Sequence, residues 1–257
     1  MKTHLPKIAL AIALLGLLQP AFAAPAPDAA KKIRVLLVTG DDVLPYHDWR
    51  EVSQAVKETL VASGRFDVRV SEDSGILDSA ATLNRYDLVF LQMFNAKTPT
   101  ISDVAKSNLT AFVKGGKGLA LAHLSSASFK EWSEFPKLVG RVWVMGKSGH
   151  NARSVFRAHV VDKEHPITRG MADFDADDEL YAKLQGDTPI HVLVSADSDW
   201  SHQTEPLAFT VEYGQGRVFQ ETFGHDGKAI KNESVAKLTQ HGCEWAATGK
   251  VADNSAK

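Results

Sequence analysis

Several residue types and motifs that common classes of protein need are scarce or absent in this sequence. Its 257 residues include one cysteine, Cys243, so no disulfide can form within the chain. The 29 basic and 31 acidic side chains give a net charge of −2, which offers no electrostatic case for binding nucleic acid. We therefore expect no nucleic-acid partner, and we expect Cys243 to be a small buried residue rather than a nucleophile.

Motifs that bind nucleotides or mark common zinc sites are missing as well. The chain has no GxGxxG after its first apolar strand, and no GxxxxGK[ST], HExxH or CxxC. We expect no nucleotide cofactor. Its ten histidines, with Asp and Glu, remain as the candidates for chemistry.

Long apolar runs are absent after the first 23 residues. Residues 1–23 begin with Lys2 and Lys7, continue with an apolar run over 8–18, and end in the small-x-small pattern Ala21-Phe22-Ala23. This run is too short to cross ~30 Å of hydrocarbon, so the pattern predicts a secretory signal peptide; an uncleaved membrane anchor is the alternative. We expect a periplasmic or secreted protein with no membrane contact after cleavage.

The remaining chain reads as a linker, one domain and a tail. Residues 24–32 are rich in Ala and Pro, residues 33–247 carry the regular hydrophobic patterns, and residues 248–257 form the tail. A domain of this size buries a large core by itself. Without disulfides, its stability comes from that core, a metal or a partner subunit, so a homo-oligomer remains open.

Strand and helix patterns alternate in the first half of the domain. Apolar, β-rich runs predict strands at 33–39, 66–70, 87–92 and 118–123, and helical spacing predicts helices at 49–63 and 101–113. Alternation of this kind indicates parallel strands with crossover helices. Shorter links in the second half predict an antiparallel extension, with strands at 156–161, 190–195, 207–213 and 216–223 and a final helix at 236–247.

Polar side chains gather where predicted strands end, which is the edge at which ligands bind to parallel sheets. His123 ends an otherwise apolar strand and precedes the small-residue turn that begins at Ser125. His225 and Asp226 lie between Gly224 and Gly227, after the last strand. Each histidine is either a reacting group or a hydrogen-bonded structural residue, and the spacing alone leaves both interpretations open.

Two further segments offer polar groups. In the loop after the first strand, His47 and Trp49 could contact a sugar ring, while Asp48 is placed to cap the helix that follows. The run Asp177-Asp178-Glu179-Leu180-Tyr181 puts three acids before an expected strand. Such acids suit acid–base catalysis or the binding of a hard cation, but they more usually lie in a solvent-exposed turn.

Histidines on separate strand ends could also hold a divalent metal, because imidazole suits Zn, Fe, Cu or Ni. Nothing in the sequence fixes the distances between them. The metal and its ligands therefore stay unassigned, and His150, His191, His202 and His241 are taken as structural or surface residues. His165-Pro166 is read as the start of a helix.

Several of these segments together resemble the trehalose-utilisation, or ThuA-like, family from about residue 33 to 247. They are Tyr46-His47-Asp48-Trp49, Gly115 to His123, His165 to Gly170, Asp178 to Tyr181, Gly214 to Phe219, and Gly224-His225-Asp226. The resemblance implies a flavodoxin-like, class I glutamine amidotransferase-like three-layer α/β sandwich with a mostly parallel sheet. On that plan His123 occupies the turn where an amidotransferase carries its cysteine, so thiol-based glutamine hydrolysis is not expected here.

The family is associated with sugar catabolism through 3-keto intermediates. The resemblance therefore implies a carbohydrate-active hydrolase or lyase acting on a small carbohydrate, with His123 or His225 as the acid or base. The substrate contacts expected are His47, Trp49, Ser125, Glu179, Tyr181 and Asp226. A non-catalytic sugar-binding or accessory module is the main alternative, and a metal-dependent hydrolase outside sugar chemistry is another.

Overall fold

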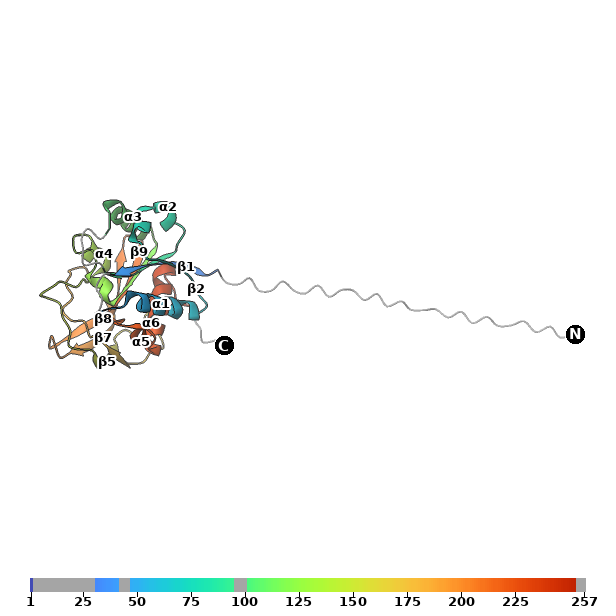
Figure 1. The fold of residues 1–257 in the computed structure, drawn as a ribbon. Coiled ribbons are helices and arrows are strands. Elements are labelled where there is room, and N and C mark those ends of the chain that lie inside the picture. Colours follow the sequence, from blue (N-terminus) through green and yellow to red (C-terminus); the bar gives the residue numbers. More distant parts are fainter. Residues whose placement is uncertain (2–30, 42–46, 95–100, 253–257) are drawn as a thin grey trace. The chain divides into compact units, whose positions relative to one another are not determined.

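A computed structural model gives the fold of residue 1 and of residues 31–41, 47–94 and 101–252 (Figure 1). Residues 2–23 of the predicted signal peptide, residues 24–30 of the predicted linker and the last five residues lie outside this described part. Within it, no helix combines the length and the apolar character needed to cross a membrane.

One nine-stranded sheet organises the domain, with the strand order β2-β1-β3-β4-β9-β8-β7-β5-β6. Its strands are β1 (Ile33–Asp41), β2 (Phe66–Ser71), β3 (Leu88–Phe94), β4 (Gly118–Ala122), β5 (Ser154–Val160), β6 (Phe174–Asp178), β7 (His191–Ser198), β8 (Gln203–Tyr213) and β9 (Gly216–Glu221). The pairs β1–β2, β1–β3, β3–β4 and β4–β9 are parallel, and every other pair is antiparallel. The predicted mostly parallel sheet with an antiparallel extension is confirmed.

Helices cover both faces of the sheet. They are α1 (Trp49–Ala62), α2 (Ala80–Leu83), α3 (Asp103–Lys114), α4 (Phe135–Val139), α5 (Gly227–Ile230) and α6 (Glu233–Thr248), with short 3₁₀ helices η1 (Ser74–Asp78) and η2 (His123–Ala127). Successive β1 residues alternate between two separate cores. Val35 and Leu37 pack with α1 and α6, whereas Leu36 and Val38 pack with α3 and α4. These are the three layers that the family resemblance implies.

Local signals explain the ends of these elements. Asp48 caps α1, as predicted, by accepting hydrogen bonds from the backbone N–H groups of Arg50 and Glu51. Gly214 and Gln215 form the tight turn between β8 and β9. Cys243 is fully buried in α6, and burial raises the pKa of its thiol, which fits the expected structural role.

Two local expectations were wrong. The acids at 177–179 do not precede a strand: Asp177 and Asp178 end β6, and Glu179 follows it. His165-Pro166 begins a hydrogen-bonded turn rather than a helix, with the N–H groups of Thr168 and Arg169 donating to His165 O. At the acids a long-range strand pairing decides the conformation, and at His165 a side-chain contact does. Neither contact can be recognised in the local sequence pattern.

The topology places the ends of β1, β4, β6 and β9 at the same edge of the sheet. β4 is parallel to β9, and the alternating antiparallel pairs from β9 to β6 bring β6 back to the direction of β9. β1 runs the same way through β3 and β4. The segments that follow β1, β4, β6 and β9 therefore leave from the same edge, although they are far apart in sequence.

Candidate metal centre

Four side chains from these four strand ends converge on one point. His47 follows β1, His123 follows β4, Glu179 follows β6 and His225 follows β9. Each offers one nitrogen or oxygen atom, and these four atoms all lie within 4.8 Å of one another. Such a set is close enough to bind a single metal ion.

Backbone strain and a short hydrogen bond fix the direction of His123. This residue has a φ of 45°, in the left-handed region that non-glycine residues seldom adopt, and its side chain is fully buried. Its Nδ1 lies 2.6 Å from Thr222 O, so Nδ1–H donates to that carbonyl. The lone pair of Nε2 then points toward Glu179, whose Oε2 is 3.3 Å away.

His47 is oriented in the same way. Its Nδ1 lies 3.3 Å from the backbone oxygen of His225, which makes Nδ1–H the donor and leaves the lone pair on Nε2. Its ring meets those of His123 and His225 edge-on, with centroids 5.1 and 4.8 Å away. Carbonyls that fix the tautomer of a ligating histidine are the usual outer partners in protein metal sites.

Glu179 and His225 complete the group. Glu179 Oε2 lies 3.2 Å from His225 Nδ1. These two atoms and His123 Nε2 are buried, and no described group forms a hydrogen bond with any of the three. Buried polar atoms are nearly always satisfied, so three converging orphan atoms point to a ligand between them.

The ionisation states follow from the same contacts. Burial, and then the nearby His123, lowers the pKa of His47 to about 4. Burial opposes the ionisation of Glu179, but His123 and His225 hold the pKa of this carboxyl well below its usual range. Glu179 in turn raises the pKa of His225. The centre thus presents one carboxylate, a neutral imidazole at His47, and a His225 ring whose basicity the neighbouring carboxylate increases.

Asp178 holds the His225 segment in place. Its carboxylate accepts hydrogen bonds from the backbone N–H of Gly224 at 2.7 Å and of His225 at 3.1 Å, and from that of Glu179 at 2.8 Å. Gly224 has a φ of 121°, a conformation that favours glycine. One buried carboxylate therefore ties the ends of β6 and β9 together and sets the spacing of two of the four converging groups.

The donor set fits a divalent transition metal. Three imidazoles and one carboxylate suit Zn²⁺, Fe²⁺, Mn²⁺ or Ni²⁺ better than Ca²⁺ or Mg²⁺, which prefer oxygen ligands. The residues that would hold the ion are His47, His123, Glu179 and His225.

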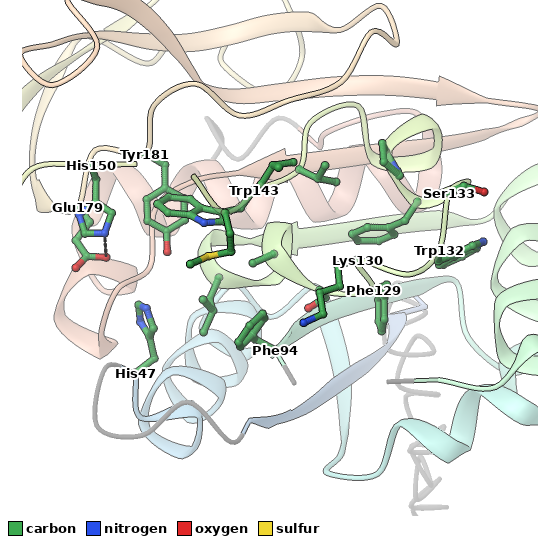
Figure 2. Close-up of a pocket in the computed structure, with 18 residues that line it drawn as sticks. His47, Phe94, Phe129, Lys130, Trp132, Ser133, Trp143, His150, Glu179 and Tyr181 are labelled. Carbon is green, nitrogen blue, oxygen red and sulfur yellow. Dashed lines mark ion pairs between the residues drawn. The ribbon is translucent and has the colours of Figure 1, made fainter. Parts of the chain in front are cut away.

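A cavity of about 1000 Å³ opens beside the cluster (Figure 2). His47, Glu179 and Tyr181 line it, and so do two residues of the segment before β5, Trp143 and His150. Tyr181 stacks on His123 with centroids 4.0 Å apart, and Trp143 packs against Tyr181 at 4.7 Å. We call the end of the cavity beside His47, Glu179 and Tyr181 the metal end. It combines the ligand atoms of the cluster with an aromatic surface.

The other predicted contacts lie elsewhere. Ser125 is buried and links η2 to β3, donating to Leu91 O and accepting from Met93 N–H. Asp226 caps α5 and pairs with Arg153. Trp49 is 8% exposed, lies under the Arg50 guanidinium, and lines a separate, smaller hollow. The structure thus brings His47, Glu179 and Tyr181 to His123 and His225, and it gives Ser125, Asp226 and Trp49 other positions.

His150 and Trp143 were not expected at this site. His150 Nε2 lies 3.6 Å from Glu179 Oε2, and its Nδ1 lies 2.6 Å from Asn151 O. Both residues belong to an irregular segment without a hydrophobic period. The isolated bridge between Gly149 and Ala182 brings this segment beside Tyr181, and the sequence carries no sign of that long-range pair.

Comparison with known proteins agrees with this architecture. The family model described as "ThuA: Trehalose utilisation" matches residues 34–246, which is most of the chain. The chain belongs to the ThuA family. No curated protein matches the sequence.

Solved structures of ThuA-like proteins have the same fold. A ThuA-like protein from Parabacteroides merdae ATCC 43184 is 27% identical, with a TM-score of 0.75 over 87% of this chain and 93% of that one. Another from Bacteroides uniformis ATCC 8492 is 16% identical, with a TM-score of 0.68 over 87% and 95%. A cytoplasmic protein from Salmonella typhimurium is 14% identical, with a TM-score of 0.57 over 82% and 98%. The last two show the fold alone.

Proposed function

We propose that this ThuA protein is an exported, metal-dependent enzyme of carbohydrate catabolism that acts on oxidised (3-keto) sugars or glycosides. The observation that carries the proposal is the convergence of His47, His123, Glu179 and His225, with unpaired buried donor atoms, beside a large cavity. The description of the family as trehalose utilisation supports the carbohydrate class.

The chemistry that suits this site is elimination from a 3-keto glycoside. The ketone at C3 acidifies the C2–H bond, so a base can take that proton. The electron pair forms the C1–C2 double bond, the C1–O bond to the aglycone breaks, and the departing oxygen takes up a proton. The products are an unsaturated keto sugar and an alcohol, and no oxidant or reductant is consumed.

His150 is the residue we assign to proton transfer. A cation, when bound, would supply Lewis-acid polarisation of the ketone oxygen. His150 lines the cavity outside the four-residue cluster, and donation from Nδ1–H to Asn151 O leaves its Nε2 lone pair toward Glu179 and the cavity. This assignment makes His123 and His225 metal ligands, in place of the acid or base role that the family resemblance implies for them.

Metal analysis joined to a substrate assay tests the proposal. We expect the purified full chain to bind close to one equivalent of a divalent transition metal, as measured by elemental analysis before and after chelation. In D₂O, the loaded protein should exchange the C2 proton of a 3-keto glucoside and release its alcohol, both followed by NMR. His150→Ala should lower both rates at least ~100-fold while retaining the metal.

His202→Asn is the matched control. His202 is exposed in the turn between β7 and β8 and has a φ of 56°, a conformation that asparagine tolerates. This variant should keep full metal content and full activity. A protein that binds the metal and binds the sugar tightly, but neither exchanges the C2 proton nor releases the alcohol, would instead favour a non-catalytic sugar-binding module. A chain that binds no transition metal would contradict the metal assignment.

A further inference from the structure

The cavity has two chemically different ends. His47, His150, Glu179 and Tyr181 lie at one end of the view in Figure 2, and Trp132 and Ser133 lie at the other, with Phe94 and Phe129 between them. We call the residues away from the cluster the apolar wall: Phe94, Phe129, Trp132, Phe135, Pro136 and Val142. Among the described residues that line the cavity, hydrogen-bonding side chains are concentrated at the metal end.

The apolar wall is built as a packed aromatic surface. Phe129 meets Phe135 edge-on with centroids 4.9 Å apart, and Trp132 stacks on Phe135 at 5.7 Å. Phe129, Trp132 and Phe135 are at most 8% exposed, so their ring positions are set by the core and not by solvent. A rigid wall of this kind is pre-formed for an apolar ligand group.

Hydroxyl and ammonium groups are few along that wall. Outside the metal end, the lining residues in the described part of the chain with such groups are Ser128, Lys130 and Ser133. Ser128 already donates its hydroxyl to Met93 O. A second sugar ring has hydroxyls around its whole rim, and each one buried without a partner lowers affinity. An aromatic ring carries none.

The size of the cavity also fits a ligand with more than one ring. Its volume of about 1000 Å³ is at the upper limit of the ~300–1,000 Å³ typical of small-molecule sites. Trp143 and Tyr181, with His150 and Glu179 beside them, give a single sugar both a stacking face and polar partners. The space along the apolar wall remains for the group attached to that sugar.

We propose that the reactant is a glycoside with an aromatic aglycone, whose oxidised sugar faces the metal end and whose aglycone lies against the apolar wall. This inference rests on the proposed function, and it selects an aryl or arylalkyl glycoside over a disaccharide. It assigns Phe129, Trp132 and Phe135 as residues that determine specificity.

Binding of two unreactive glucosides to the full chain tests the inference. 2-Phenylethyl glucoside and ethyl glucoside differ by one phenyl ring, and without the C3 ketone neither can undergo elimination. We expect calorimetry to give about 30-fold tighter binding for the phenylethyl compound, because the ring leaves water for the apolar wall. Trehalose should bind at least as weakly as the ethyl compound. Equal affinities, tighter binding of trehalose, or no detectable binding would overturn the inference.

Trp132→Leu supplies the residue-level test. It should reduce the preference for the phenylethyl compound at least fivefold, whereas Trp245→Leu, a control at a half-buried tryptophan in α6, should not change it. The ligand comparison in the unmutated chain decides the question if Trp132→Leu does not fold. Turnover is measured separately with the oxidised glucosides, whose two alcohols have similar acidity. Tighter binding of the phenylethyl compound without turnover of its oxidised form would contradict the proposed function but not the aromatic aglycone. Turnover of both oxidised glucosides at equal kcat/KM would contradict the aromatic aglycone but not the proposed function.

Discussion

At the scale of single residues, Glu179 decides whether the cluster can hold a cation. Its Oε2 is the atom that faces His123, His225 and His150, at 3.3, 3.2 and 3.6 Å. Among the four clustered side chains, Glu179 is the one that supplies a negative charge to balance that of a bound cation. The carboxylate is therefore the ligand whose loss should be most visible.

We predict that Glu179→Gln lowers the affinity for Zn²⁺ or Mn²⁺ at least ~100-fold, because the amide carries no charge and is a weaker ligand. Competition with a chelating dye measures this affinity. Glu212→Gln, at an exposed position in β8, should bind metal like the unmutated chain. Unchanged affinity in Glu179→Gln would remove this residue from the centre.

Glu221 is a second buried acid with a different role. It ends β9, is fully buried, and accepts a hydrogen bond from the Thr239 hydroxyl. Burial, with a contribution from Asp178, raises its pKa to about 8. The folded chain keeps this proton up to about pH 8, whereas the unfolded chain loses it near the ordinary pKa of about 4.3. The folded state therefore binds more protons in that interval, and stability falls as pH rises through it.

We predict that Glu221→Gln removes this penalty. At pH 7 the variant should be more stable than the parent chain by roughly 1–3 kcal/mol, and near pH 4 the two should be equal. Urea unfolding at both pH values measures the difference. A stability gain that does not depend on pH would show that packing, and not ionisation, separates the two side chains.

At the scale of elements, Asp178 connects the end of β6 to the segment after β9. Its carboxylate accepts from three backbone N–H groups, those of Glu179, Gly224 and His225. The adjoining residue Asp177 performs a different task, pairing with Arg153 and Lys228 at the surface. Neighbouring acids in one run thus have separate structural roles.

We predict that Asp178→Asn destabilises the fold by roughly 1–3 kcal/mol, because one acceptor oxygen is replaced by an NH₂ group that faces backbone N–H groups. Amide exchange should become faster at Gly224 and His225, and metal affinity should fall as the His225 ring loses its fixed position. Urea unfolding and hydrogen exchange measure these changes.

The control is Asp175→Asn on the same strand. Asp175 pairs with Arg157, and both side chains are more than half exposed, so this change should alter stability by less than ~0.5 kcal/mol. Protected amides at 224 and 225 in Asp178→Asn would show that another group holds the segment.

At the scale of the whole molecule, the first 23 residues carry a prediction about where the protein functions. Their pattern predicts export, although one fold relative from Salmonella typhimurium is described as a cytoplasmic protein. Export would give the site access to carbohydrates before they enter the cell. It is also compatible with a domain that has a single buried thiol and depends on its core for stability.

We predict that expression in a Gram-negative host gives a periplasmic protein whose first residue is Ala24, as identified by mass spectrometry. Ala23→Arg places a large cation at the cleavage position and should leave the precursor unprocessed in the membrane fraction. Recovery of the complete 257-residue chain from the cytoplasm would contradict the signal peptide.

Much of the parallel half of the fold could be predicted from local patterns. The runs that became β1, β3 and β4 are nearly continuous in apolar residues, which is typical of strands buried on both faces. His123 follows β4 directly, so its position at the end of a parallel strand was predictable. The strand that precedes His225 was expected in the antiparallel extension, and its parallel pairing with β4, which brings His225 to the same edge, was not predicted.

The sequence by itself determined the parallel strands β1 to β4, the helices α1, α3 and α6, and the histidines that follow strands, since each depends on neighbours within one turn or one run. The tertiary structure alone decided that Glu179 follows a strand, that His150 and Trp143 reach the cavity, and that Asp226 and Trp49 do not line it. These outcomes depend on pairings between distant segments, such as β5 with β6 and Gly149 with Ala182. The side-chain directions are fixed by carbonyls and carboxylates that lie near only in the folded chain.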